Sequence, residues 1–226
     1  VPNAKFSPAF KNRMWDGKIY LFNTMTKELY LGLLPYVEHF AAEREYQIEY
    51  VGDVLSQESF SLKEANNFID RLKLKMTPRD YQIDSFTHCI RNNRSIIVSP
   101  TASGKSFIIY LLTEYYSRKT LLIVPTTSLV HQMRSDFIEY GMHPDDIHII
   151  MGGEEKTTDR PIVISTWQSI YKMQKKYFEY FDVVIGDEVH LFKAKSLTSI
   201  MTKLVDCKYR FGFTGTLDGI EINKLV

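Results

Sequence analysis

Residues 95–106 contain a short apolar strand, a loop of small residues and the start of a helix. Backbone N–H groups of such a loop and helix start converge on one point, where they favour an anion. Lys105 would supply positive charge to the β- and γ-phosphates of a nucleotide, and the Ser106 hydroxyl would ligate Mg²⁺. Ser99 stands where the pattern G-x-x-x-x-G-K-S/T has its first glycine, so the segment alone could also be an ordinary strand-to-helix connection. The predicted nucleotide-binding residues of the loop are Thr101, Ala102, Ser103, Gly104, Lys105 and Ser106.

An apolar strand farther along the chain ends in Asp187 and Glu188. At the carboxyl end of a parallel strand, Asp187 can reach a metal ion held by Ser106. Glu188 can orient or deprotonate a water molecule aimed at the γ-phosphate. The alternative is a solvated acidic turn, which is common for adjacent Asp and Glu. Because the pair occurs together with the phosphate loop, we interpret Lys105, Asp187 and Glu188 as catalytic residues for hydrolysis of a nucleoside triphosphate.

These residues are positioned by an alternation of short apolar strands and helices that begins near residue 94. Continuous apolar strands separated by helices are typical of a mainly parallel sheet covered on both faces. The predicted strands are residues 96–98, 121–124, 147–150, 162–164, 183–185 and 210–213, and the predicted helices include residues 128–140 and a helix after Gly104. The predicted fold class is therefore α/β.

A small α+β module is predicted at the start of the chain. Its elements are a β-hairpin with arms at residues 18–22 and 28–31, a helix that opens at Pro35, and a strand at residues 47–51. The first 27 residues are basic and carry aromatic side chains that could stack on nucleic-acid bases while the cations contact phosphates. The alternative is that these aromatic residues form the core of a small sheet. They are Phe6, Phe10, Trp15 and Tyr20.

Two helices are predicted between this module and the sheet. Ser61 opens a capping box for a helix over residues 62–72. Thr77 and Pro78 are the predicted start of the next helix, which would expose Gln82. We place the domain boundary between these helices, with a small α+β domain at residues 1–75 and the nucleotide-binding domain at residues 76–226.

Composition narrows the class of protein. A chain of 226 residues with 44% hydrophobic content can form one α/β domain and a small companion. The net charge of +1 means that nucleic-acid binding depends on local patches. The two cysteines lack C-x-x-C spacing, which fits a reducing compartment and gives no metal framework. With no apolar run of membrane-spanning length and no signal-peptide core, we expect a cytoplasmic protein without membrane contact. The chain does not begin with Met, so we expect a piece of a longer protein.

Small polar residues follow three of the predicted strands. The carboxyl ends of parallel strands lie at one edge of a sheet, where ligands bind. Hydroxyl and N–H groups there can bind phosphates without reading bases, although each alone is more simply a helix N-cap. Together they predict a nucleic-acid track, to which the Lys- and Tyr-rich residues 171–178 would add cations unless they are only a solvated helix end. The track residues are Pro125, Thr126, Thr127, Thr166, Trp167 and Gln168, with Thr214, Gly215 and Thr216 after the last strand.

In this order, the motifs resemble those of superfamily-two helicases. Residues 100–106 resemble motif I, residues 124–127 motif Ia, residues 187–190 a D-E-x-H motif II, and residues 213–216 motif III. Tyr81-Gln82 is similar to the glutamine motif that recognises adenine. The resemblance covers residues 77–217. It implies a RecA-like P-loop domain that hydrolyses ATP with Mg²⁺, held by Ser106 and Asp187.

The start of the chain makes the resemblance more specific. Ser7-Pro8 with Phe10, then residues 15–19, resemble the phage UvsW-type recombination helicases, in which a small N-terminal domain precedes two RecA-like domains. The resemblance implies a monomeric helicase or translocase that binds DNA mostly independently of sequence. It would act on branched recombination or replication intermediates by fork regression and branch migration.

The same resemblance assigns roles to residues outside the phosphate loop. It places Gln82 on adenine, and it implies that His190, Thr214, Gly215 and Thr216 couple hydrolysis to DNA contacts. It also implies a second RecA-like domain in cis that this chain lacks, so we expect the chain alone to be poorly active. Ala102 departs from the family pattern, which often has Gly there, and a positive φ at this position would imply strain.

Two other functions remain open from the sequence. A motor with the same first domain, such as the translocating subunit of a restriction enzyme or an XPB-like remodeller, differs only in lacking the module around residues 15–17. A protein of another class, a nucleotide-gated DNA-binding module without turnover, would carry the same phosphate loop. DNA-stimulated ATP hydrolysis by the complete protein distinguishes the module from the motors.

Overall fold

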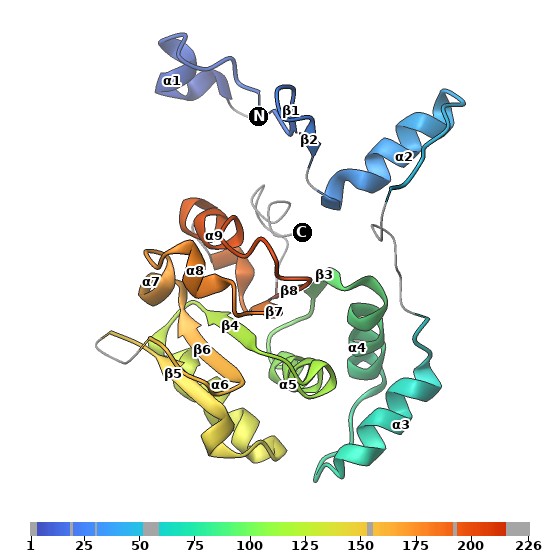
Figure 1. The fold of residues 1–226 in the computed structure, drawn as a ribbon, viewed down its shortest axis with the longest axis vertical. Helices are drawn as coiled ribbons and strands as arrows, with labels where there is room; N and C mark the ends of the chain where they lie inside the picture. The colour runs from blue at the N-terminus through green and yellow to red at the C-terminus, as the bar shows by residue number, and fades with distance from the viewer. Residues whose placement is uncertain are drawn as a thin grey trace. The chain divides into compact units, whose positions relative to one another are not determined.

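The computed structural model describes residues 4–18, 20–29, 31–51, 59–152, 156–191 and 194–215 (Figure 1). The chain divides into two units, residues 1–52 and 53–226. This division comes before the predicted boundary at residue 75, because the helix over Leu62–Leu72 contributes Ala65 and Ile69 to the core of the second unit. The amphipathic face of this helix is visible in the sequence, but its packing partner is not.

The first unit contains short elements joined by turns. They are a 3₁₀ helix at Ala4–Phe6, α1 at Pro8–Lys11, the antiparallel pair β1 at Phe22–Asn23 and β2 at Glu28–Leu29, a 3₁₀ helix at Leu31–Leu33 and α2 at Leu34–Glu43. The hairpin and the helix confirm the prediction, although the hairpin arms are shorter. The strand predicted at residues 47–51 is wrong: this segment has no strand partner among the described residues, and its Tyr50 hydroxyl donates instead to Glu38 of α2 at 2.6 Å.

The aromatic residues of the first unit do not form the core of a small sheet. Phe6 is 64% exposed and Tyr20 is 75% exposed. The indole N–H of Trp15 donates to the carbonyl oxygen of Lys18 at 2.7 Å, which closes a local turn. The structure therefore contradicts the core alternative, because Phe6, Phe10 and Tyr20 are exposed and Trp15 is half-buried.

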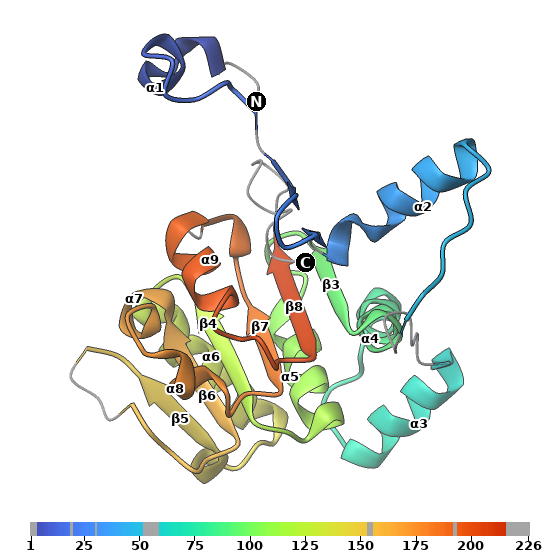
Figure 2. The ribbon, with the colours of Figure 1, turned by 45° about the horizontal axis from the view of Figure 1, so that its top comes forward.

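The second unit contains one parallel sheet of six strands among its described residues (Figure 2). The strand order is β3-β8-β7-β4-β6-β5, and every neighbouring pair is parallel. The strands are β3 at Arg94–Val98, β4 at Thr120–Val124, β5 at Ile147–Ile150, β6 at Ile162–Thr166, β7 at Val183–Gly186 and β8 at Tyr209–Thr214. The predicted α/β class and parallel sheet are confirmed.

Both faces of this sheet are covered, because successive side chains of a strand point to opposite faces. In β4, Leu122 and Val124 belong to one apolar core and Leu121 and Ile123 to the other. The first core is completed by α3 at Leu62–Leu72, α4 at Asp80–Asn92, α5 at Lys105–Tyr116 and α6 at Thr127–Tyr140. The second is completed by α7 at Trp167–Ile170, α8 at Lys175–Phe178 and α9 at Ala194–Met201. Short 3₁₀ helices lie at Pro144–Asp146 and Val189–Leu191.

The starts of α3 and α4 test two sequence predictions. Ser61 and Glu64 form the predicted capping box, with the Ser61 N–H donating to Glu64 at 2.7 Å and the Glu64 N–H donating to the Ser61 hydroxyl at 3.2 Å. The start predicted for α4 is wrong, since the helix begins at Asp80 rather than at Thr77. Its first turn is stabilised by Gln82, whose side-chain oxygen accepts from the Arg79 N–H at 2.9 Å. None of the helices in the described ranges could cross a membrane.

Candidate nucleotide-hydrolysis site

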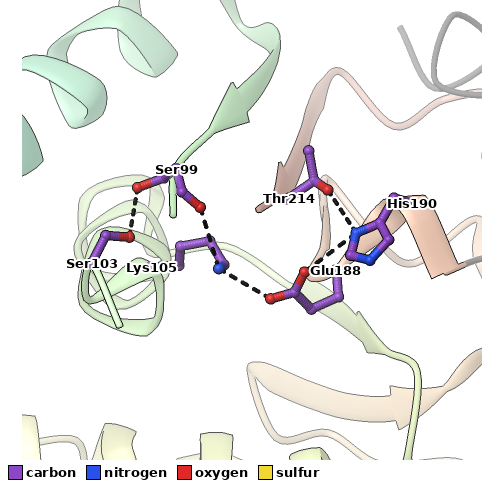
Figure 3. Close-up of polar contacts among 6 residues, drawn as sticks. All are labelled: Ser99, Ser103, Lys105, Glu188, His190 and Thr214. Atoms are coloured by element: carbon purple, nitrogen blue, oxygen red, sulfur yellow. Dashed lines mark hydrogen bonds and ion pairs between the residues drawn. The ribbon is translucent and has the colours of Figure 1, made fainter. Parts of the chain in front are cut away.

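The phosphate loop connects β3 to α5 at the carboxyl edge of the sheet. Ala102 has a φ of 64° and Gly104 a φ of 77°, so both adopt the left-handed conformation. Glycine does so at no steric cost, but an L-residue such as alanine is strained there. Ser99, which replaces the first glycine of the pattern, hydrogen-bonds through its hydroxyl to that of Ser103 at 2.6 Å (Figure 3). Ser99, where the pattern has glycine, therefore provides a side-chain contact that closes the loop.

Lys105, at the first position of α5, is buried and paired with Glu188. Its Nζ lies 3.0 Å from Glu188 Oε1 and donates to the Ser99 carbonyl oxygen at 3.4 Å (Figure 3). A buried ammonium group requires a charged or polar partner because desolvation is costly. The ion pair brings together the two residues to which the sequence assigns phosphate binding and water activation.

Asp187, at the end of β7, is a buried carboxylate with an unsatisfied oxygen. It is 6% exposed, and among the described residues its Oδ1 has no hydrogen-bond partner. Burial, and then the nearby Glu188, raise the pKa of Asp187 to about 6, while Lys105 acts in the opposite direction. A divalent cation is the partner that a buried carboxylate oxygen of this kind fits. Asp187 thus offers a buried carboxylate oxygen without a described partner, and its role as a Mg²⁺ ligand stays a prediction.

Ser106, the other predicted Mg²⁺ ligand, contacts α6. Its hydroxyl lies 2.9 Å from the Tyr140 hydroxyl and also hydrogen-bonds to Asp136. Burial raises the pKa of Asp136, and the hydrogen bond from Ser106 opposes that change. Neither of these two α6 residues was predicted from the sequence. Asp136 and Tyr140 are four positions apart, which predicts that they share one face of a helix. This spacing does not indicate which loop that face contacts.

Gln82 corrects one prediction about the site. It is 7% exposed rather than solvated, and its amide nitrogen donates to the carbonyl oxygens of Ser103 at 3.1 Å and Gly104 at 3.4 Å. The neighbouring Tyr81 hydroxyl also donates to the Ser103 oxygen, at 2.7 Å. The glutamine-motif residues thus hold the phosphate loop against the start of α4. The contact of Gln82 with adenine stays a prediction.

His190 connects the acidic motif to the end of β8. Its Nδ1 lies 2.7 Å from the Thr214 hydroxyl and 3.4 Å from Glu188 Oε2 (Figure 3). Gly215 lies beside the phosphate loop, since a Cβ built on it would be 3.7 Å from the Thr101 hydroxyl. These contacts bring three of the predicted coupling residues to the nucleotide site. Thr216 lies outside the described residues.

The predicted nucleic-acid residues are divided between exposed and buried positions. Val124 and Thr166 are register partners, so the ends of β4 and β6 lie side by side. Thr126, Thr127 and Gln168 are exposed next to these ends, Trp167 is half-buried, and Pro125 and Thr166 are buried. Thr126 caps α6 by accepting from the Leu129 N–H at 3.3 Å, and the Thr166 hydroxyl lies 3.0 Å from that of Ser169. Their contact with DNA stays a prediction.

Residues 171–178 begin beside that edge, where the Tyr171 ring centroid lies 6.0 Å from that of Trp167, and then lead away from it. Lys172, Lys176 and Tyr177 line a pocket together with Lys119 and Asp159, which precede β4 and β6. Lys176 therefore lies with the amino ends of the strands, away from the track, whereas Lys172 lies over the Tyr171 ring at 5.5 Å, and its contribution of charge to the track stays a prediction.

Each of the two units matches a family of known proteins. Residues 75–219 match the family described as "Type III restriction enzyme, res subunit", and residues 1–51 match "DNA helicase UvsW, N-terminal". The ATP-dependent DNA helicase uvsW of Enterobacteria phage T4 is 34% identical over 227 residues, which is 94% of this chain and 45% of that protein. The DNA 3'-5' translocase XPB2 of Sulfurisphaera tokodaii is 33% identical over 155 residues, 66% of this chain and 34% of that protein. This chain thus spans less than half of either relative.

A solved structure gives the same result for the fold. The crystal structure of the UvsW helicase from bacteriophage T4 superimposes with a TM-score of 0.88 at 32% identity, covering 100% of this chain and 84% of that one. The likeness confirms the RecA-like helicase fold of the second unit. The chain therefore belongs to the type III restriction enzyme res-subunit family, and both of its units are similar to the phage T4 UvsW helicase.

Proposed function

We propose that this chain is the N-terminal domain and first motor domain of an ATP-dependent DNA helicase that acts on branched recombination or replication intermediates. Fork regression and branch migration are its proposed reactions. The observation that carries the proposal is the contact of Lys105 with Glu188 beside the buried, unsatisfied Asp187. The protein would work as a monomer in the cytoplasm of an infected bacterial cell.

The geometry supports a division of roles during hydrolysis. Ser106 and Asp187 would hold Mg²⁺, which when bound neutralises charge on the β- and γ-phosphates. Lys105 binds the same phosphates, and in doing so it leaves Glu188. Glu188 then orients the attacking water and takes up its proton at a carboxylate oxygen.

Coupling to DNA is proposed to run through His190. Its Nδ1 contacts both Glu188 and Thr214, so a change in the protonation or position of Glu188 alters the hydrogen bond at the end of β8. Gly215 follows β8 next to the phosphate loop. Movement of this strand end relative to the loop would link the nucleotide state to the DNA contacts of the track.

The first unit is proposed to bind DNA as well. A pocket of about 560 Å³ within this unit is lined by three cations, two aromatic rings and one carboxylate, which are Lys5, Lys11, Arg13, Phe10, Trp15 and Asp16. Cations beside exposed aromatic rings are typical of surfaces that contact phosphates and stack on bases. Such contacts are independent of sequence and weaken with salt.

The proposal is tested by DNA-stimulated ATP hydrolysis of the full-length protein. We expect Lys105→Ala to abolish nucleotide binding or turnover, because it removes the cation aimed at the phosphates. Glu188→Gln should bind ATP but not turn it over. Lys63→Ala and Glu179→Gln, at exposed positions, are the matched controls. Unchanged hydrolysis in either site variant would contradict the assignment.

The second candidate is the translocating subunit of a restriction enzyme, which the family match over residues 75–219 favours. The match of residues 1–51 to the UvsW N-terminal family supports the branched-DNA helicase instead. The branched-DNA helicase and the translocating subunit are distinguished by comparing how strongly forked DNA and linear duplex stimulate ATP hydrolysis. Equal stimulation at saturating DNA would favour the translocating subunit.

A further inference from the structure

A pocket of about 840 Å³ lies away from the nucleotide site, at the opposite edge of the sheet. Lys119 precedes β4, Asp159 precedes β6 and Phe181 precedes β7, and all three residues line it. Lys105 and Asp187 instead follow the carboxyl ends of β3 and β7. The pocket is therefore separate from the nucleotide site and from the predicted nucleic-acid track.

Lysine side chains give the pocket an excess of positive charge. Asp159 is the one carboxylate among the described lining residues. All the lysines except Lys119 are on the exposed surface, and Lys119 is bound through its Nζ to the Thr158 carbonyl oxygen at 2.6 Å. A concave surface with this charge attracts a polyanion. The lysines are Lys119, Lys156, Lys172 and Lys176.

Part of the pocket lining is apolar and aromatic. Val163 and Phe181 are 1% and 4% exposed, whereas Tyr180 is 64% exposed. The Tyr177 ring packs edge-on against Phe181 with 5.5 Å between the centroids, and its buried hydroxyl has no hydrogen-bond partner among the described residues. Burial raises the pKa of Tyr177 to about 12, so this hydroxyl remains a hydrogen-bond donor at neutral pH. Because this hydroxyl is shielded from solvent, the pocket offers a ligand the aromatic rings, above all the exposed ring of Tyr180, rather than the hydroxyl.

The ligand that combines these requirements is single-stranded nucleic acid. Its phosphates match the lysines, and an unstacked base offers both a flat face and polar edge atoms. A duplex keeps its base faces stacked inside and presents phosphates and base edges, so it offers no free base face to an aromatic ring. An acidic peptide matches the charge, but it need not supply a planar group for Tyr177 and Tyr180.

We propose that this pocket binds an unpaired strand of nucleic acid, with phosphates on Lys172 and Lys176 and a base against Tyr177 and Tyr180. The inference rests on the proposed helicase function, because separation of a branched DNA produces an unpaired strand beside the motor. The pocket would hold that strand at the edge of the sheet remote from the nucleotide, which keeps it from re-pairing.

The first test measures binding of a dye-labelled oligothymidylate to the full-length protein by fluorescence anisotropy at several salt concentrations. The double variant Lys172→Glu with Lys176→Glu should bind at least about tenfold more weakly. The slope of log affinity against log salt concentration should become shallower by about 1.4, because each of the two lost phosphate contacts contributes about 0.7. Tyr180→Ala should lose about tenfold with an unchanged slope, because stacking is not ionic. Lys63→Glu, at an exposed position of α3, is the control.

The second test localises the strand. An oligonucleotide carrying 5-iodouracil should photo-crosslink to Tyr177 or Tyr180, as identified by mass spectrometry. The proposal would be overturned by crosslinks that form only outside the pocket, or by unchanged binding in all pocket variants. It would also be overturned if a polyglutamate peptide occupied the pocket and the oligonucleotide did not. Lys105→Ala should keep the crosslink while losing hydrolysis, and Tyr180→Ala should keep duplex-stimulated hydrolysis. Failure of the pocket and failure of the helicase assignment are thus distinguishable.

Discussion

At the scale of single residues, the site contains one backbone conformation and one buried carboxylate that are unfavourable for folding. Ala102 is left-handed, and Asp187 is buried with an oxygen that no described residue satisfies. Unfavourable local states that persist in a fold cluster at functional sites, where binding compensates them. Substitution of either residue should therefore raise the stability of the fold, although both lie in the functional site.

Ala102→Gly should stabilise the protein. The left-handed conformation costs an L-residue about 1–2 kcal/mol, and the greater flexibility of glycine in the unfolded chain offsets about 0.5–1 kcal/mol of this. We expect the free energy of unfolding, measured by chemical denaturation, to rise by about 0.5–1 kcal/mol. Ala65→Gly, inside α3, is the control with the opposite sign. A loss of stability in both variants would show that the loop is not strained at residue 102.

Asp187→Asn should raise stability at neutral pH in a metal-free buffer. The pKa of Asp187 is raised from 3.8 to about 6, so the folded state retains a proton that the unfolded state has lost. Folding stability from this group therefore decreases as pH rises from about 4 to 6 and stays low above that range. The difference in unfolding free energy between variant and parent should grow across this window toward at most about 3 kcal/mol. Asp70→Asn is the control, and a variant less stable than the parent at pH 7 would refute the argument.

At the scale of elements, the start of α4 and the phosphate loop form one unit. Gln82 joins them through an N-terminal cap on one side and two carbonyl contacts on the other. The loop can keep its left-handed turns because these contacts fix it against a helix. The nucleotide therefore meets a preorganised loop rather than one that it must order.

Gln82→Ala should weaken this junction. Loss of buried hydrogen bonds of this kind costs about 1–3 kcal/mol of folding stability. The affinity for ADP should also fall, because the loop is less well ordered. Gln132→Ala, at an exposed position on α6, is the control for both measurements. An equal loss of ADP and GDP affinity indicates the loop contact alone, whereas a loss confined to ADP indicates a contact with adenine.

Elements were predictable where a local pattern determines them. The apolar strands of the sheet and the capping box at Ser61 follow from residues that are adjacent in sequence. The strand at residues 47–51 was wrong because a strand exists only with a neighbour, and the sequence does not show that the described part of the unit offers none. The burial of Gln82 and the contact of Ser106 with Tyr140 were missed for the same reason, since each depends on a partner distant in sequence.

At the scale of the whole molecule, the proposed function requires a second motor domain to complete the nucleotide site. The chain supplies Lys105, Ser106, Asp187 and Glu188, and it spans 45% of the phage T4 relative. An arginine from outside the phosphate loop is worth about 10³–10⁵ in rate in related motors. The isolated chain should therefore fold, bind nucleotide weakly and turn it over slowly.

The comparison of two proteins tests this expectation. DNA-stimulated kcat should be about 10³-fold or more lower for the isolated chain than for the protein extended through its downstream domain. The isolated chain should also show no strand separation of forked DNA. Equal kcat values would mean that the active site is complete within residues 1–226.

The strand that begins the phosphate loop has its sheet neighbour at the far end of the domain. Within the described residues β3 pairs only with β8, and β8 also separates β3 from β7. During synthesis on a ribosome, β3 therefore remains an unpaired edge until residue 214 has emerged, long after Lys105 has appeared. Such distant pairing is slow, and unpaired edges invite association with other chains. The growing chain thus acquires its phosphate loop early, but it assembles the Lys105–Glu188 and His190–Thr214 contacts only when the last strand is inserted into the sheet.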